Sequence, residues 1–277
     1  MPELPEVQTV VNDLNESGIP GRKIISVQVK WPRTVNTHEP RQFIEALRGL
    51  KFLEIHRRAK YIVFGMSESL SLIVHLRMTG QFSIKAKAPN CKHTHIILEL
   101  DDSRYLCFKD TRKFGRWSLV PENHMLFSKI GPEPFGDDLT PKIFYENCKD
   151  RNRQLKPLLL DQSFIAGIGN IYADEALFDS GLHPQSIASN LSKKKAAQLL
   201  ASIRKVLSIG LSNMGTTLGT GAANFYSVSS RRGRNQDKLM VFRRTGEPCY
   251  ICGSIIQRLI VAQRSTHVCL FCQKRRK

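Results

Sequence analysis

Four cysteines near the carboxyl end constrain this chain more than any other feature of its sequence. They form two pairs, Cys249 with Cys252 and Cys269 with Cys272, and residues 253–268 separate the pairs. Four thiolates at this spacing are typical of a tetrahedral zinc site in which the protein fills every coordination position. The sequence therefore predicts one structural Zn²⁺, with no position open for a catalytic water.

The segment around these pairs is too short for a core of its own, so we expect the metal to supply much of its folding free energy. Residues 255–262 are predicted as one strand of a hairpin that turns at residues 263–266. The other three cysteines, Cys91, Cys107 and Cys148, are scattered. We expect them to be ordinary small residues in or near a core.

The net charge indicates the kind of partner. Lys and Arg total 42 against 24 Asp and Glu, which gives a formal charge of +18 and a pI of about 9.8. Such an excess favours a polyanion. A membrane surface is the competing polyanion, but no stretch approaches the roughly 18 apolar residues of a spanning helix, and no amphipathic anchor or signal peptide is evident. We therefore expect a cytoplasmic protein that binds nucleic acid and no membrane.

Hydrophobic periodicity separates a strand-rich part from a helical part. A helical stripe covers residues 7–14, and one further helix is predicted over residues 41–50. Short apolar runs separated by turn residues predict an antiparallel sandwich or barrel around them. The runs are residues 24–31, 52–56, 61–65, 72–76, 95–100 and 105–109.

Beyond the strand-rich part the predicted elements are helical. Residues 143–149 and 155–160 are predicted as short helices, Asn170 as the cap of the next helix, and residues 191–211 as a longer one. Residues 215–237 have no periodicity and predict a mobile loop. The expected fold is α+β and multidomain, with a β-sandwich domain at 1–130, a linker at 131–141, a helical domain at 142–237 and a zinc finger at 238–277.

The sequence opens with Met-Pro-Glu-Leu-Pro-Glu. If Met1 is removed, the ring nitrogen of Pro2 becomes a secondary amine, and a terminal amine titrates at about 7.7 to 8.0, so it can attack carbon near neutral pH. Glu6 lies one helical turn beyond Glu3, so both carboxylates can face that amine. The alternative is that these residues merely start a helix.

These six residues resemble the start of the formamidopyrimidine-DNA glycosylase family, bacterial repair enzymes that excise oxidised purines such as 8-oxoguanine. The related endonuclease VIII group typically has Gly where this chain has Leu4. Further motifs extend the resemblance over nearly the full length, because residues 162–175 resemble the family's helix-two-turn-helix and residues 264–273 resemble its zinc finger. The family often has Gly and Pro where this chain has Gln263 and Leu270.

The resemblance implies a bifunctional glycosylase and abasic-site lyase. Pro2 would attack the sugar carbon that bears the damaged base and form an imine, Glu3 would move protons at the sugar oxygen, and Glu6 would support that site. Lys60 and Arg264 would neutralise the phosphates that leave in two later eliminations. Without the resemblance, a lysine at a strand edge and an arginine at a hairpin tip are usually surface charges. No cofactor besides zinc is implied.

When a glycosylase extrudes its target nucleotide, unstacking and unpairing that nucleotide costs a few kcal/mol and leaves a gap in the base stack. The resemblance assigns that gap to Met78, Arg112 and Phe114, although by pattern alone each belongs to a turn or a core. His93 is assigned to a DNA phosphate. A metal site at Cys91, His93 and His95 is the disfavoured alternative, since no second ligand cluster lies near in sequence. The other residues expected at DNA phosphates are Arg151, Arg153, Lys156 and Asn170.

The expected partner is damaged double-stranded DNA, bound by a monomer associated with the bacterial nucleoid. Two other functions remain open at this point. One is an oxidised-pyrimidine glycosylase resembling endonuclease VIII. The other is a non-catalytic zinc-finger protein that binds DNA, for which charge and cysteines suffice.

Overall fold

The computed structural model describes residues 1–122, 124–219 and 225–275, and the chain divides into two compact units. The first unit comprises residues 1–127 and 213–236. The second comprises residues 128–212 and 237–277. The chain thus returns to the first unit late in the sequence, before it forms the carboxyl-terminal hairpin.

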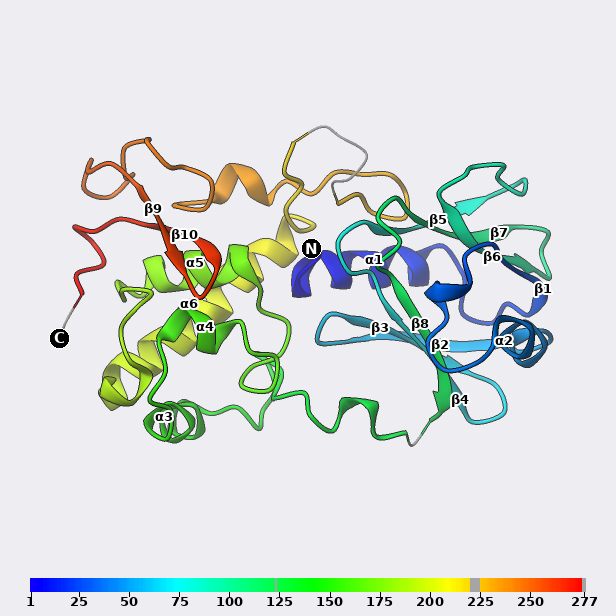
Figure 1. Cartoon of the computed structure of the whole chain (residues 1–277), viewed down its shortest axis with the longest axis horizontal. Coiled ribbons are helices and arrows are strands. Elements are labelled where there is room, and N and C mark those ends of the chain that lie inside the picture. Colours follow the sequence, from blue (N-terminus) through cyan, green and yellow to red (C-terminus); the bar gives the residue numbers. More distant parts are fainter. Residues whose placement is uncertain (123, 220–224, 276–277) are drawn as a thin grey trace. The chain divides into compact units, whose positions relative to one another are not determined.

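The first unit contains two four-stranded antiparallel sheets that form a sandwich (Figure 1). The predicted sandwich is confirmed. One sheet has the order β1 (Ile24–Val29), β6 (Thr94–Leu100), β7 (Tyr105–Asp110) and β5 (Gly80–Lys85). The other has the order β2 (Phe52–Arg58), β3 (Tyr61–Met66), β4 (Leu70–His75) and β8 (Arg116–Pro121).

Aromatic side chains join the two sheets. The ring centroid of Phe82 on β5 lies 5.8 Å from that of Phe64 on β3 and 5.5 Å from that of Trp117 on β8. Phe108 on β7 lies 5.4 Å from Trp117. All four rings are buried, and because aromatic rings remove large apolar areas from water, they account for much of the cohesion of the sandwich.

Helix α1 (Leu4–Glu16) fixes the amino terminus on this sandwich. The predicted stripe is buried, and its residues belong to the same core cluster as the strands. Asn15 adds a hydrogen bond from Nδ2 to the carbonyl of Ile55 on β2, 3.0 Å long. A second helix, α2 (Pro40–Leu47), buries Phe43 and Leu47. The rigid core therefore positions the first turn of α1.

The second unit is helical and ends in a hairpin (Figure 1). Its helices are α3 (Pro141–Lys149), α4 (Leu155–Leu159), α5 (Asn170–Asp179) and α6 (Lys193–Ser212), and its strands are β9 (Gln257–Val261) and β10 (Arg264–Val268). Helices α5 and α6 approach closely at Gly210, where an added Cβ would lie 2.5 Å from the hydroxyl of Tyr172. In the described part of the chain, no helix has both the length and the apolar character that crossing a bilayer requires.

Three local expectations differ from the structure. Strands β5 and β8 were not predicted, because polar residues and a terminal proline interrupt their apolar pattern. Gly169, rather than Asn170, is the N-cap of α5, and Asn170 begins the helix. The hairpin turns at Ala262 and Gln263, both with positive φ, so Arg264 opens strand β10 instead of lying in the turn.

Candidate active site

The first turn of α1 gathers the predicted acidic residues. Glu3 caps the helix, and a capping box links it to Glu6, whose Oε2 accepts a hydrogen bond of 2.8 Å from the backbone N–H of Glu3. Pro5 suits the start of the helix, where its missing N–H has no partner to lose. Pro2, Glu3 and Glu6 are all buried. The simple helix-start interpretation is therefore correct as local structure, but it does not explain why carboxylates are buried there.

The second carboxylate oxygen of Glu6 binds a segment far away in the sequence. Its Oε1 accepts a hydrogen bond of 2.6 Å from the backbone N–H of Thr216. The preceding residue, Gly215, has φ +76°, and a Cβ there would lie 2.7 Å from that oxygen. Only glycine suits both the conformation and the space. Glu6 thus links the amino-terminal helix to residues 213–219.

Charged side chains surround the amino terminus. Burial lowers the pKa of the Met1 α-amino group; Glu3 and Glu6 act in the opposite direction, and Lys60 and Arg112 add to the lowering. A lowered pKa increases the unprotonated fraction of an amine near neutral pH. The structure therefore brings four of the sequence-predicted residues within electrostatic reach of the terminal amine.

Lys60 lies in the tight turn between β2 and β3, and only 4% of its surface is exposed. Its neighbour Ala59 has φ +54°. Arg57 holds this turn, since its Nη1 donates to the carbonyl of Ala59 (3.0 Å) and its Nε donates to Gln8 Oε1 on α1 (3.1 Å). The lysine is buried beside the site, not solvated as surface lysines are.

His75, at the end of β4, is a buried neighbour that the sequence analysis did not single out. Its Nδ1 accepts a hydrogen bond of 2.9 Å from the backbone N–H of Arg77. Burial, together with Arg77 and Lys60, lowers the pKa of His75 to about 3. The ring is therefore neutral at physiological pH and adds no positive charge near Lys60.

The three residues predicted to fill the base stack are exposed at loop tips of the first unit. Met78 and Phe114 are 40% and 46% exposed. The guanidinium of Arg112 lies 4.9 Å from the ring centroid of Phe114, a cation–π distance. Large apolar side chains left in water at adjacent loops are available for a partner.

His93 lies just before β6 and is half exposed, whereas His95 is buried with its Nε2 2.7 Å from the carbonyl oxygen of Asp110. Within the described residues, the cysteines near the carboxyl end are the one group suited to a metal, so Cys91, His93 and His95 do not form a second one. Cys107 and Cys148 behave as core residues, because burial raises the pKa of their thiols to about 11 and about 12.

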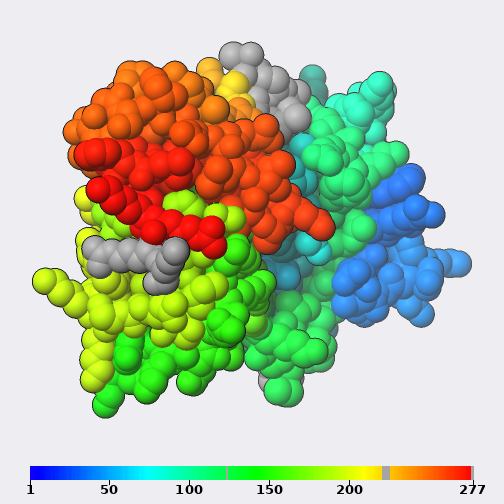
Figure 2. Space-filling view, turned by 60° about the vertical axis from the view of Figure 1, so that its left-hand side comes forward, coloured from blue at the N-terminus to red at the C-terminus, as the bar shows by residue number. Residues whose placement is uncertain are grey.

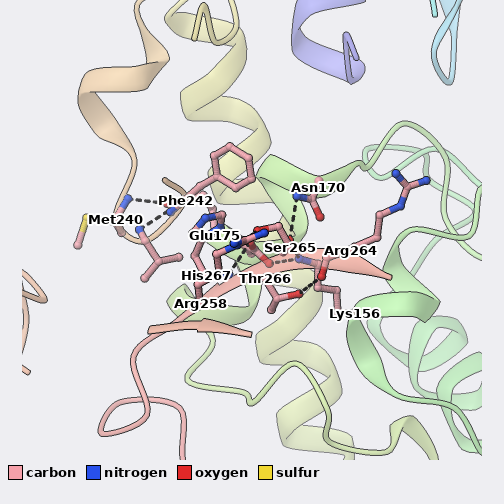
Figure 3. A network of polar contacts seen from close by, with 12 residues as sticks. Lys156, Asn170, Glu175, Met240, Phe242, Arg258, Arg264, Ser265, Thr266 and His267 are labelled. Carbon is pink, nitrogen blue, oxygen red and sulfur yellow. Dashed lines mark hydrogen bonds and ion pairs between the residues drawn. The ribbon is translucent and has the colours of Figure 1, made fainter. Parts of the chain in front are cut away.

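In the second unit, Lys156 on α4 lies beside Ser265 of β10 (Figure 3), and its side chain is fully buried. Its Nζ donates to Asp174 Oδ1 on α5 at 2.6 Å and to the carbonyl of Ser265 on β10 at 2.8 Å. Asp174 Oδ2 also accepts from the backbone N–H of His267 at 2.9 Å. In this structure Lys156 presents no surface to a phosphate and instead holds the hairpin.

Asn170 also holds the hairpin, since its Nδ2 donates to the Ser265 carbonyl at 3.0 Å. The side chain of Arg264 extends away from these contacts and is exposed (Figure 3). Arg151 is exposed, and Arg153 pairs with Asp161 at 2.8 Å on the surface. The acidic anchor Asp174 gave no sequence signal, because an aspartate in a helix is usually solvated.

The four cysteines form the predicted cluster. Their Sγ atoms all lie within 4.8 Å of one another, with 3.9 Å between Cys249 and Cys272 and 3.4 Å between Cys252 and Cys269. Tetrahedral Zn–S bonds of about 2.3 Å fit such separations. Figure 2 shows this carboxyl-terminal segment, orange to red, at the surface beside yellow-green helical residues. The residues fit one structural Zn²⁺.

Three segments of the sequence match described protein families. Residues 1–117 match the formamidopyrimidine-DNA glycosylase N-terminal domain, residues 130–221 the formamidopyrimidine-DNA glycosylase H2TH domain, and residues 246–275 a zinc finger found in FPG and IleRS. Two similar relatives are formamidopyrimidine-DNA glycosylases. That of Protochlamydia amoebophila is 45% identical over 276 residues, and that of Herpetosiphon aurantiacus is 44% identical over 277 residues; each alignment covers 99% of this chain and 100% of the relative.

Solved structures of the Lactococcus lactis enzyme are also similar. Its complex with DNA containing an abasic site has a TM-score of 0.90 and 37% identity to this chain. Its complex with DNA containing Fapy-dG has a TM-score of 0.89 and 37% identity. Both alignments cover 99% of this chain and 100% of that chain.

Proposed function

The chain belongs to the formamidopyrimidine-DNA glycosylase family, and from this premise we propose how its own amino terminus carries out the reaction. It is a DNA glycosylase and abasic-site lyase that removes oxidised purines. The comparisons favour this function over the oxidised-pyrimidine enzyme and over the non-catalytic zinc-finger protein. The reaction needs an attacking amine, proton transfer at the sugar and neutralisation of the leaving phosphates.

Removal of Met1 gives the amine. The nitrogen of Pro2 then attacks the sugar carbon that bears the damaged base, and the bond to the base breaks with its electron pair leaving on the base. Glu3 transfers a proton at the sugar oxygen as the ring opens, and an imine links protein and DNA. The imine acidifies the neighbouring carbon, so the two flanking phosphates are eliminated in turn. Lys60 and Arg264 offset the negative charge of these leaving groups.

One observation carries this assignment: Pro2, Glu3 and Glu6 are buried together at the start of α1, and Glu3, Glu6, Lys60 and Arg112 all lie within electrostatic reach of the amine of Met1, the residue next to Pro2. A buried acid that is also a helix cap, next to the residue whose nitrogen attacks the sugar, suits proton transfer at that sugar. Glu6 uses both oxygens on backbone N–H groups, so it positions the first turn while Glu3 exchanges the proton.

Borohydride trapping tests the nucleophile. Reduction of the imine makes a stable covalent adduct between the protein and a duplex that carries 8-oxoguanine. We expect the processed protein to form this adduct. A variant with residues retained before Pro2 should form none, because its nitrogen is then an amide. The matched control carries the same added residues at the carboxyl end and should be trapped as the unmodified protein is.

Mass spectrometry of the purified protein checks that Met1 is absent, and peptide mapping of the adduct identifies the linked residue. Undiminished trapping of the variant extended before Pro2 would move the nucleophile to a lysine, with Lys60 the first candidate. Faster cleavage of a matched duplex carrying an oxidised thymine than of one carrying 8-oxoguanine would contradict the oxidised-purine substrate.

We also propose that the protein binds damaged DNA as a monomer. The excess of basic over acidic residues supports contacts with DNA phosphates. Sedimentation velocity of the protein alone and with one equivalent of abasic duplex measures the stoichiometry. A complex containing two protein chains would overturn the monomer.

A further inference from the structure

Two loops of the first unit meet at one buried carboxylate. Asp110 ends strand β7, Gly80 opens the neighbouring strand β5, and these two residues are directly paired. Asp110 is 1% exposed, and Thr79, which precedes Gly80, is also buried. The loop before β5 carries Met78, and the loop after β7 carries Arg112 and Phe114.

The Asp110 carboxylate accepts hydrogen bonds from both loops. Thr79 Oγ1 donates to Asp110 Oδ1, and the backbone N–H of Arg112 lies 3.2 Å from the same oxygen and 3.1 Å from Thr79 Oγ1. The backbone N–H of Gly115 donates to Asp110 Oδ2 at 2.6 Å. One side chain therefore fixes both ends of the loop between Arg112 and Gly115, and the threonine hydroxyl joins that loop to the other.

The conformation of the second loop depends on these bonds. Lys113 has φ +59°, an uncommon value for a residue with a side chain, and an added Cβ at Gly115 would lie 2.5 Å from the ring of Phe108. The loop is thus pressed against the core at its base, while Phe114 at its tip remains exposed. Both oxygens of the buried Asp110 carboxylate accept hydrogen bonds beneath exposed loop tips. This arrangement is expected of a residue that holds the loops in one conformation.

We propose that Asp110 and Thr79 are positioning residues that hold Met78, Arg112 and Phe114 as one preformed wedge for the gap left by the extruded nucleotide. This inference rests on the proposed function, because the wedge has a role only if a base leaves the stack. Side chains already ordered in the free protein lose less conformational entropy on insertion than side chains on two independent loops. Neither positioning residue touches DNA; they act through the three tip residues.

The test removes the joining hydroxyl without changing the shape of the side chain. Thr79→Val deletes Oγ1, and Thr79→Ser keeps it. A control is Thr37→Val, because Thr37 Oγ1 also joins its own segment to a strand of the same unit: it donates to the carbonyl of Leu119 (3.2 Å) and accepts from the N–H of Leu119 (3.1 Å). Single-turnover excision is measured on a duplex carrying 8-oxoguanine. Borohydride trapping is measured in parallel on an abasic site in a single strand, where no partner base has to be stabilised.

We expect Thr79→Val to slow excision in duplex DNA by about 10- to 100-fold, the scale of a misplaced site, while trapping on the single strand is unchanged. Thr79→Ser should restore excision, and Thr37→Val should leave both assays at the level of the unmodified protein. The cost of combining Met78→Ala with Arg112→Ala should be less than additive in the unmodified background and additive with Thr79→Val.

Several outcomes would overturn the inference. Excision by Thr79→Val equal to that of the unmodified protein would remove the role of the hydroxyl. A parallel loss in both assays, or an equal loss in Thr37→Val, would show a general structural effect. Asp110→Asn is the second variant, since its amide would face the N–H of Gly115 with a donor, and it should repeat the duplex-specific loss. If the unmodified protein forms no adduct on either substrate, the proposed function itself fails and the wedge with it.

Discussion

The two units bury acidic pairs of the same kind for different purposes. In α1, Glu3 and Glu6 stand one helical turn apart and act on a terminal amine. In α5, Asp174 and Glu175 are adjacent, so they point in different directions. Asp174 binds Lys156 and strand β10, while Glu175 accepts from the backbone N–H groups of residues 240–242 at 2.7, 3.0 and 2.8 Å.

The difference lies in the partners, since burial is similar in both pairs. The α5 pair accepts hydrogen bonds only from donors within the fold among the contacts described above. Through these bonds Glu175 attaches residues 240–242 to α5, and Asp174 attaches the hairpin to it. The α1 pair lies within electrostatic reach of the terminal amine. In the proposed reaction a buried acid takes part in chemistry because it lies near a group that the substrate reaches, whereas Asp174 faces an ammonium that is itself fully buried.

Removing the metal from the second unit should cause the largest loss of stability, and it tests whether that unit depends on its zinc finger. Chelation, or Cys269→Ser, should unfold the hairpin and lower DNA affinity, because structural zinc contributes about 10–16 kcal/mol of apparent binding free energy to such segments. Calorimetry with and without chelator measures it. Cys148→Ser, at a buried cysteine outside the cluster, is the control: it keeps all four ligands and should respond to chelator as the unmodified protein does, whereas Cys269→Ser should show no further loss.

Glu3→Gln should break activity while leaving the fold intact. The amide can still accept the capping hydrogen bond but cannot deliver a proton, so base excision should fall by about 10²- to 10⁴-fold. Glu16→Gln, an exposed change in the same helix, is the control. Quenched-flow excision and thermal unfolding are measured together. A large loss of stability would assign Glu3 to the scaffold, as for the α5 pair.

Asp174→Ala, in contrast to Glu3→Gln, should lower the free energy of unfolding. It leaves the ammonium of Lys156 buried without its carboxylate, and breaking a buried ion pair costs about 3–5 kcal/mol. Denaturant unfolding measures the loss. Asp179→Asn breaks the exposed pair with Lys205 and should cost less than about 1 kcal/mol. Equal costs would mean that the buried pair is not the anchor of the hairpin.

The smallest effect concerns pH. The pKa of His75 is near 3 in the folded chain and near 6.5 when unfolded, so only the unfolded chain takes up this proton as the pH falls below 6.5. The free energy of unfolding should therefore decrease as the pH is lowered below 6.5, and His75 should account for up to about 1.4 kcal/mol of this decrease per pH unit. His75→Asn should flatten the dependence between pH 6.5 and about 5 in denaturant titrations. His124→Asn, at an exposed position, should not.

Sequence patterns were sufficient for the sandwich, the helical unit and the metal cluster, because each depends on periodicity or spacing. They missed β5 and β8, whose buried faces are set by tertiary pairing. The acidic residues at the amino terminus were predicted because they are close in sequence. Asp110, Asp174 and the burial of Lys156 were not, since each acquires its role from a residue at least 18 positions away.

The hydrogen bond between Glu6 and Thr216 joins residues 210 positions apart. During translation it can therefore form only long after α1 has been synthesised. A ribosome releases the amino-terminal helix first and the residue that holds its glutamate near the end of synthesis. Until then Glu6 lacks the second of its two backbone partners. A product truncated before residue 216 therefore cannot form the hydrogen bond that holds the first turn of α1 from a distant part of the sequence.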